Sequence, residues 1–89
     1  MIKKRRKLNK DFEKKIYSSK KNVELVLAKI YDIDDEDIQK DYMSAFQEVV
    51  YLYDRFKENY EEIGFNDNSE ELLSNYKNAF NLFESEFEI

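Results

Sequence analysis

The sequence contains no cysteine, no histidine and no proline, and it has a single glycine. Without cysteine, the chain can form neither a disulfide framework nor a thiolate site. Without histidine, it lacks the side chain that most often exchanges protons near neutral pH and binds metal ions. So little glycine and no proline argue against a β-sandwich or another turn-rich fold. We therefore expect a helical protein that is not an enzyme and uses no metal or cofactor.

Long hydrophobic runs are also missing, since no apolar stretch approaches the roughly 18 residues that a membrane span needs. The charged first ten residues are not followed by the apolar segment of a secretion signal. We therefore expect a cytoplasmic protein that does not act at a membrane. The chain of 89 residues is long enough for one small domain, and its hydrophobic content of 42% is enough for a core.

The longest helical pattern covers residues 35–63, where apolar side chains recur every three or four positions between Ile38 and Ile63. The apolar arc is wider than the stripe of a helix that packs on one side only. A helix of this kind needs neighbours on two flanks, so we expect it in the middle of a bundle. Gly64 follows it, where a helix end often has a residue with positive φ.

A second pattern covers residues 9–31. Its apolar seam extends from Phe12 to Ile30, and Ser19 is the one polar residue on that seam. Asn9 precedes the seam and is a candidate N-cap, because its side chain can accept a backbone N–H of the first turn. This pattern predicts the first helix.

A third pattern covers residues 69–87, with Asn68 or Ser69 as the candidate N-cap. Asp34 or Asp35 is the candidate N-cap of the middle helix. Both connections are only a few residues long, so neighbouring helices are expected to be antiparallel.

The predicted fold is therefore an all-α, antiparallel three-helix bundle, with helices at about 9–31, 35–63 and 69–87. The bundle forms a single domain of residues 9–89, preceded by a basic N-terminal arm of residues 1–8. We expect Phe56 and Phe80 to lie near the middle of the apolar faces of their helices. The seams also allow a coiled-coil homodimer, so the sequence leaves monomer and homodimer open.

Charge is divided unevenly along the chain. Residues 1–22 carry ten basic and two acidic side chains, whereas residues 23–89 carry five basic and eighteen acidic ones. In an up-down-up bundle, the acids near residue 35 and those near residue 86 are expected at the same pole. The acids of the third helix lie at its C-terminus, where the helix dipole disfavours each anion by about 0.3–1 kcal/mol. Because helix stability does not explain them, we expect a partner-binding acidic pole formed by Asp34, Asp35, Asp37, Glu84, Glu86 and Glu88.

Three large apolar residues fall outside the expected core faces: Leu25, Tyr51 and Leu82. Single apolar residues on a surface are normal. If these three cluster, they would form a partner-binding patch with a charged rim.

The basic arm supports an alternative function. Clustered cations bind nucleic acid by releasing its counterions, and the candidate contacts are Lys3, Lys4, Arg5, Arg6, Lys7, Lys10 and Lys14. The acidic remainder of the chain would repel a duplex. The interpretation we favour for the arm is a solubilising tail that pairs with the protein's own acids.

The acidic stretch of residues 32–37 resembles the start of a calcium-binding loop only superficially. Asp37 stands where an EF-hand needs glycine, and Met43 stands where it needs glutamate. We expect these acids to cap a helix rather than to bind a metal.

Taken with the charge pattern, these features favour a small acidic regulator or inhibitor that binds another protein stoichiometrically, through a basic surface on that partner. Phage proteins that imitate nucleic acid or disable host defences, and immunity proteins against toxins, are functional analogies for such a molecule. The alternative is a nucleic-acid-binding protein that uses the basic arm and the first helix.

Overall fold

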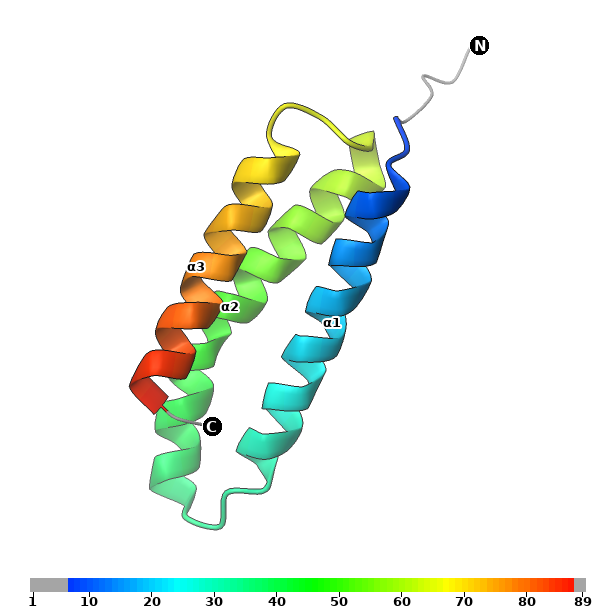
Figure 1. The fold of residues 1–89 in the computed structure, drawn as a ribbon. Coiled ribbons are helices and arrows are strands. Elements are labelled where there is room, and N and C mark those ends of the chain that lie inside the picture. Colours follow the sequence, from blue (N-terminus) through cyan, green and yellow to red (C-terminus); the bar gives the residue numbers. More distant parts are fainter. Residues whose placement is uncertain (1–6, 88–89) are drawn as a thin grey trace.

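The protein is an all-α, antiparallel three-helix bundle, as predicted (Figure 1). The structure, a computed structural model, describes residues 7–87. Helix α1 is Lys10–Tyr31, α2 is Glu36–Ile63 and α3 is Ser69–Phe87. Helix α2 packs against α1 on one flank and against α3 on the other, which confirms its central place.

The first two helices begin at capping residues that the sequence indicated. The side-chain oxygen of Asn9 accepts a hydrogen bond from the Phe12 N–H at 3.0 Å. Asp35 Oδ1 accepts from the N–H groups of Asp37 at 2.9 Å and Ile38 at 3.1 Å. These bonds satisfy backbone donors that have no partner within the first turn of a helix.

Two further residues fix the helix ends. Gly64 has a φ of 75° at the end of α2, a conformation that glycine adopts without steric cost. At the α1–α2 connection, Gln39 Nε2 donates to the carbonyls of Ile30 and Tyr31, each at 3.2 Å. The side chain of α2 therefore satisfies carbonyls at the end of α1.

The connection between α2 and α3 is organised by Asn66, which sequence reasoning did not single out. Asn66 Nδ2 donates to the Gly64 carbonyl at 2.8 Å and to Asn59 Oδ1 at 2.7 Å, and its Oδ1 accepts from the Asn68 N–H at 2.9 Å. Helix α3 begins at Ser69, one of the two predicted caps. The Ser69 hydroxyl accepts from the Asn66 N–H at 3.0 Å, so it stabilises the connection.

The end of the basic arm is held against this connection. The carbonyl of Lys7 accepts from the Phe65 N–H at 2.7 Å, and the Lys7 ammonium lies 5.9 Å from the Phe65 ring centroid. Two residues further on, the Asn9 N–H donates to the Tyr60 hydroxyl at 3.0 Å. That hydroxyl in turn donates to the Glu13 carboxylate. Residues 1–6 of the arm, and Glu88, lie outside the described residues.

Aromatic rings form the centre of the core. Phe12 of α1 contacts Phe56 of α2 with ring centroids 6.1 Å apart, and Phe56 stacks on Tyr76 of α3 at 5.4 Å. Further along the bundle, Phe46 of α2 contacts Phe83 of α3 at 4.8 Å. Rings packed in this way remove a large apolar area from water, and they add a geometric preference for edge or offset contact.

The ends of α2 and one side of α3 are less covered than the sequence pattern suggested. Ile38 and Ile63 were expected on the packed side of α2, but both are exposed, because α2 extends beyond its shorter neighbours. Phe56 is buried as predicted, with 1% of its surface exposed, whereas Phe80 is only half-buried. The Phe80 ring packs against the core, and the rest of it borders an open groove between α1 and α3.

Truncation of these two rings should therefore have unequal effects. Phe56→Ala should lower the free energy of unfolding by about 3–5 kcal/mol, because it leaves a closed cavity. Phe80→Ala should cost about 1–2 kcal/mol, because its ring is half in water already. Denaturant unfolding followed by circular dichroism measures both free energies. If an alanine variant does not fold, the same comparison can be made between Phe56→Leu and Phe80→Leu. Equal losses would mean that α1 covers Phe80 in solution.

Candidate functional site

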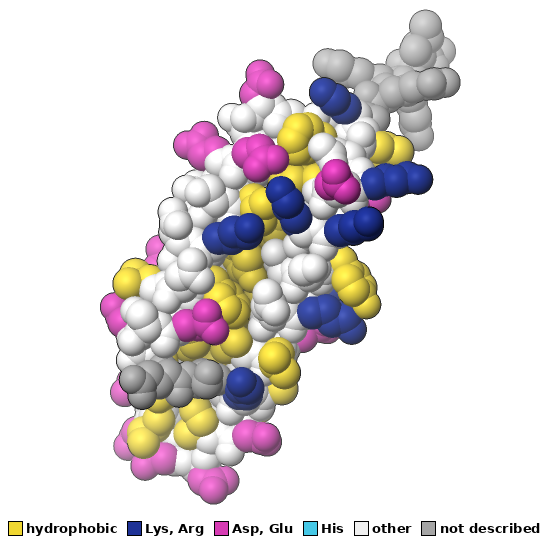
Figure 2. All heavy atoms as spheres, viewed as in Figure 1, with side chains coloured by type: hydrophobic (Ala, Val, Ile, Leu, Met, Phe, Trp, Pro, Cys, Tyr) yellow, Lys and Arg dark blue, Asp and Glu magenta, His cyan; other side chains and the backbone are white. Residues whose placement is uncertain are grey.

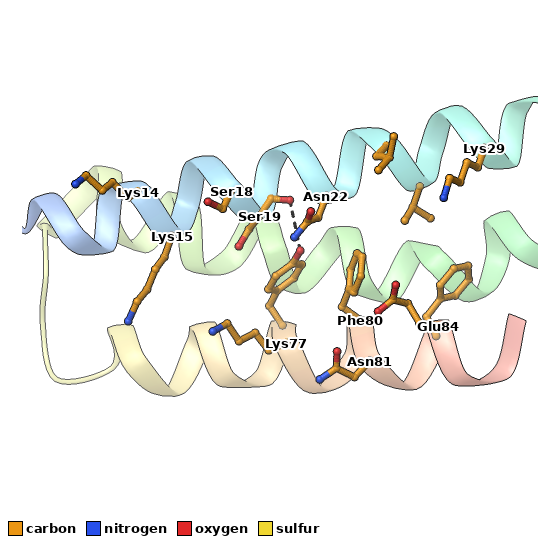
Figure 3. Close-up of a pocket in the computed structure, with 14 residues that line it drawn as sticks. Lys14, Lys15, Ser18, Ser19, Asn22, Lys29, Lys77, Phe80, Asn81 and Glu84 are labelled. Atoms are coloured by element: carbon orange, nitrogen blue, oxygen red, sulfur yellow. Dashed lines mark hydrogen bonds between the residues drawn. The ribbon is translucent and has the colours of Figure 1, made fainter. Parts of the chain in front are cut away.

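A groove with a volume of about 580 Å³ lies between α1 and α3 (Figure 3). Both helices pack on α2, but no Cα atom of α1 lies within 8 Å of one in α3. Helices in direct contact have their axes about 8–10 Å apart. At that separation, many Cα atoms of one helix lie within about 8 Å of a Cα atom in the other. The flank between α1 and α3 is therefore open, and we call it the lysine groove after the residues at its rim.

Apolar side chains form the floor of the lysine groove. Val26 of α1 and Tyr76 and Phe83 of α3 lie at the bottom and are themselves buried. Phe80 is half-buried between them, and Leu25 at the rim is 57% exposed. Figure 2 shows this apolar surface between the two helices, with lysine side chains beside it. The groove thus offers apolar contact area to another molecule.

The rim of the groove is mainly cationic. Lys14, Lys15 and Lys29 of α1 and Lys77 of α3 line it, and Glu84 is its one acidic residue. In Figure 3, Lys15 extends from α1 towards α3 near Lys77, whereas Lys29 and Glu84 lie towards the other end. Positive charge is therefore concentrated at the end of the groove near the start of α1.

One hydrogen bond crosses the bottom of the groove. The Tyr76 hydroxyl donates to the Ser19 carbonyl at 3.4 Å, and the small Ser19 side chain is buried beside it. Burial raises the pKa of Tyr76 to about 12, because the ionised phenolate would lose its hydration. Burial also raises the pKa of Tyr53, with smaller contributions from Asp54, Glu24 and Glu61.

The predicted acidic pole is not one surface among the described residues. Asp34, Asp35 and Asp37 are exposed around the start of α2. Helix α3 ends at Phe87, short of these acids (Figure 1). The Phe87 ring packs on Tyr42, with ring centroids 4.8 Å apart. Tyr42 lies six residues into α2, about 9 Å along the helix from its first residue.

The two described glutamates of the pole also face different ways. Glu84 lines the lysine groove, while Glu86 lines a second groove between α2 and α3. This second groove has a volume of about 480 Å³, and its charged residues are Glu48 and Glu86. We call it the glutamate groove. Leu82 lies at its edge. Helix α3 therefore separates a mainly cationic groove from an anionic one.

The three candidate apolar residues are exposed but do not cluster. Leu25 is 57% exposed in the lysine groove, and Leu82 is 60% exposed in the glutamate groove. Tyr51 is 57% exposed on α2, where Arg55 Nη1 donates to its hydroxyl at 3.1 Å. The three residues occupy three different faces and do not form the single patch considered from the sequence.

The candidate nucleic-acid contacts are only partly described. Lys7, Lys10 and Lys14 are exposed, whereas Lys3, Lys4, Arg5 and Arg6 lie outside residues 7–87. Glu13 shares a surface depression with Lys10 and Lys14, so a carboxylate lies among these cations. Lys14 also borders the lysine groove.

Two other kinds of site are absent from the part of the chain that the structure describes. In residues 7–87, no three acidic, cysteine or histidine side chains are grouped so that they could hold a metal ion. None of the three helices combines the length and the apolar character needed to cross a membrane.

Comparison with known proteins yields no relative: no family model matches the chain, and no curated protein or solved structure is significantly similar to it.

The raised pKa of Tyr76 predicts how stability changes at alkaline pH. Between its ordinary pKa of 10.0 and about 12, the unfolded chain loses the phenolic proton while the folded protein keeps it. The free energy of unfolding should therefore be unaffected by this group below pH 10 and should fall as the pH rises towards 12. In Tyr76→Phe, the fall should be less steep, which denaturant unfolding at several pH values would measure. Parallel curves for parent and variant would show that Tyr76 is not shielded from water.

Proposed function

We propose that this protein acts by stoichiometric binding to another protein, as a small regulator or inhibitor, rather than by catalysis. The observation that carries this proposal is the open lysine groove. Helices α1 and α3 flank α2 with no Cα atom of one within 8 Å of the other, so a half-buried ring and an exposed leucine lie where a fourth helix would pack. Grooves between helices recognise amphipathic helices in many protein complexes.

The dimensions of the groove suit such an interaction. It borders α1 from Lys14 to Lys29, which spans about 22 Å at the rise of an α-helix. A partner helix of about 15 residues, or four turns, would match this length. Phe80 near the middle of the groove and Leu25 at its rim are the apolar anchors, and apolar contacts surrounded by polar residues usually dominate binding energy.

A different face supports a second candidate interface for the same function. The glutamate groove has Leu82 beside Glu48 and Glu86, and residues 23–89 carry far more acids than bases. A partner with a basic surface, the kind that the composition suggests, would bind there or at Asp34, Asp35 and Asp37.

Three matched variants distinguish these surfaces. Leu25→Gln, Leu82→Gln and Tyr51→Gln each replace a similarly exposed apolar residue with a neutral helix former, on three different faces. The partner would first be identified by photo-crosslinking from position 25 in the native cells, and then purified for titration against each variant. Leu25→Gln should weaken 1:1 binding about tenfold, equivalent to about 1.4 kcal/mol, and the other two less than threefold.

Two results would contradict the proposal. Loss of binding in Leu82→Gln alone would move the interface to the glutamate groove. Failure to capture any protein that binds the purified chain stoichiometrically would remove the proposed function itself.

A further inference from the structure

We infer that the lysine groove binds an acidic amphipathic helix of a partner protein, which completes a four-helix bundle with α1, α2 and α3. The inference rests on the proposed function and specifies the chemistry of the partner. It combines three observations: the separation of α1 and α3, the apolar floor between them, and four lysines against one glutamate at the rim.

The arrangement of the helices determines how a fourth helix fits. Because α2 is antiparallel to both neighbours, α1 and α3 are parallel to each other (Figure 1). A helix placed between them, on the side opposite α2, can contact both at ordinary interhelical distances. If it is antiparallel to both, the four helices have the up-down-up-down arrangement of common bundles, and neighbouring helix dipoles are opposed.

The rim charges predict the composition of the helix and its direction. Lys14, Lys15 and Lys77 lie at the end near the start of α1, whereas Lys29 at the other end has Glu84 nearby (Figure 3). Acidic side chains on the bound helix should therefore be concentrated in the half beside the first three lysines. In the antiparallel orientation, this is the C-terminal half of the bound helix. Complementary charges of this kind favour the correct partner and speed association.

Two other occupants fit the groove less well. A symmetric dimer formed groove to groove would bring together four lysines and one glutamate from each copy, so repulsive pairs would outnumber attractive ones. Single-stranded nucleic acid binds by stacking its bases on exposed aromatic faces. Tyr76 and Phe83 are buried, and their rings pack against Phe56 and Phe46, so they are not available for stacking. Phe80 is then the one phenylalanine or tyrosine ring of the groove with exposed surface, which is too few for a run of stacked bases.

The test uses three synthetic peptides of about 18 residues, slightly longer than the groove. The first is an amphipathic helix with glutamates flanking its apolar stripe, mainly in the C-terminal half. The second replaces every glutamate with lysine, and the third has the composition of the first in an order that destroys the stripe.

Fluorescence anisotropy at two salt concentrations measures binding to the parent, to Lys15→Glu/Lys77→Glu, and to Lys20→Glu/Lys40→Glu. The last variant is the control, because it changes the net charge equally at exposed lysines outside the lysine groove.

The acidic helix should bind the parent 1:1, at least tenfold more tightly than either other peptide. Lys15→Glu/Lys77→Glu should weaken this binding at least tenfold, and the control variant less than threefold. Leu25→Gln should weaken it as well. Circular dichroism of each variant verifies that the bundle is intact.

Several results would overturn the inference. Equal binding of the first and third peptides, or an equal loss in the two charge variants, would show general attraction between charges rather than docking in the groove. Displacement of the acidic peptide by an unstructured oligonucleotide would assign the groove to nucleic acid. Self-association of the parent that Leu25→Gln abolishes would assign it to a second copy. If Leu25→Gln weakens the natural partner while no acidic peptide binds, the proposed function stands and this inference fails.

Discussion

Packing on both flanks of α2 is the constraint on which the rest of the molecule depends. Phe12 approaches Phe56 from α1, while Tyr76 and Phe83 approach Phe56 and Phe46 from α3. Each outer helix is therefore positioned mainly by its packing on α2, and the bond from the Tyr76 hydroxyl to the Ser19 carbonyl is the direct link described between the outer helices. The surface between the outer helices is apolar because it borders the core. It is open because no other segment of the described residues covers it. The candidate site is thus a direct consequence of how the core is built.

The helices and their caps could be predicted because they depend on local features of the sequence. Apolar periodicity indicated the three helices. Helix ends were predicted at Asn9, Asp35 and Gly64, and these residues are the caps in the structure. The angle between α1 and α3 could not be predicted in this way. This angle depends on how side chains from three helices pack together. For that reason, the apolar pattern predicted the burial of Phe56 correctly but overestimated the burial of Phe80.

The candidate site was harder to predict, because its residues come from positions far apart in the chain. Lys15 and Lys29 are fourteen residues apart on α1, and Lys77 is on α3. Only the fold brings them to one groove, and none of the three was selected from the sequence. The acidic pole was inferred by assuming that the helices end level with one another. Because α3 ends beside Tyr42, and because Glu84 and Glu86 lie two residues apart on a helix, these acids face separate grooves.

The central claim is that the backbones of α1 and α3 stay apart along the lysine groove, and the absence of native cysteine permits a direct measurement. Asn22 and Asn81 face the groove from the two helices (Figure 3). Cysteines whose Cα atoms are more than about 7 Å apart cannot form a disulfide without movement of the backbone. In Asn22→Cys/Asn81→Cys, mild oxidation should therefore leave the monomer without an internal disulfide, while a flexible bismaleimide should link the two thiols. Rapid formation of that disulfide would show that the two helices meet in solution, and that the groove is closed.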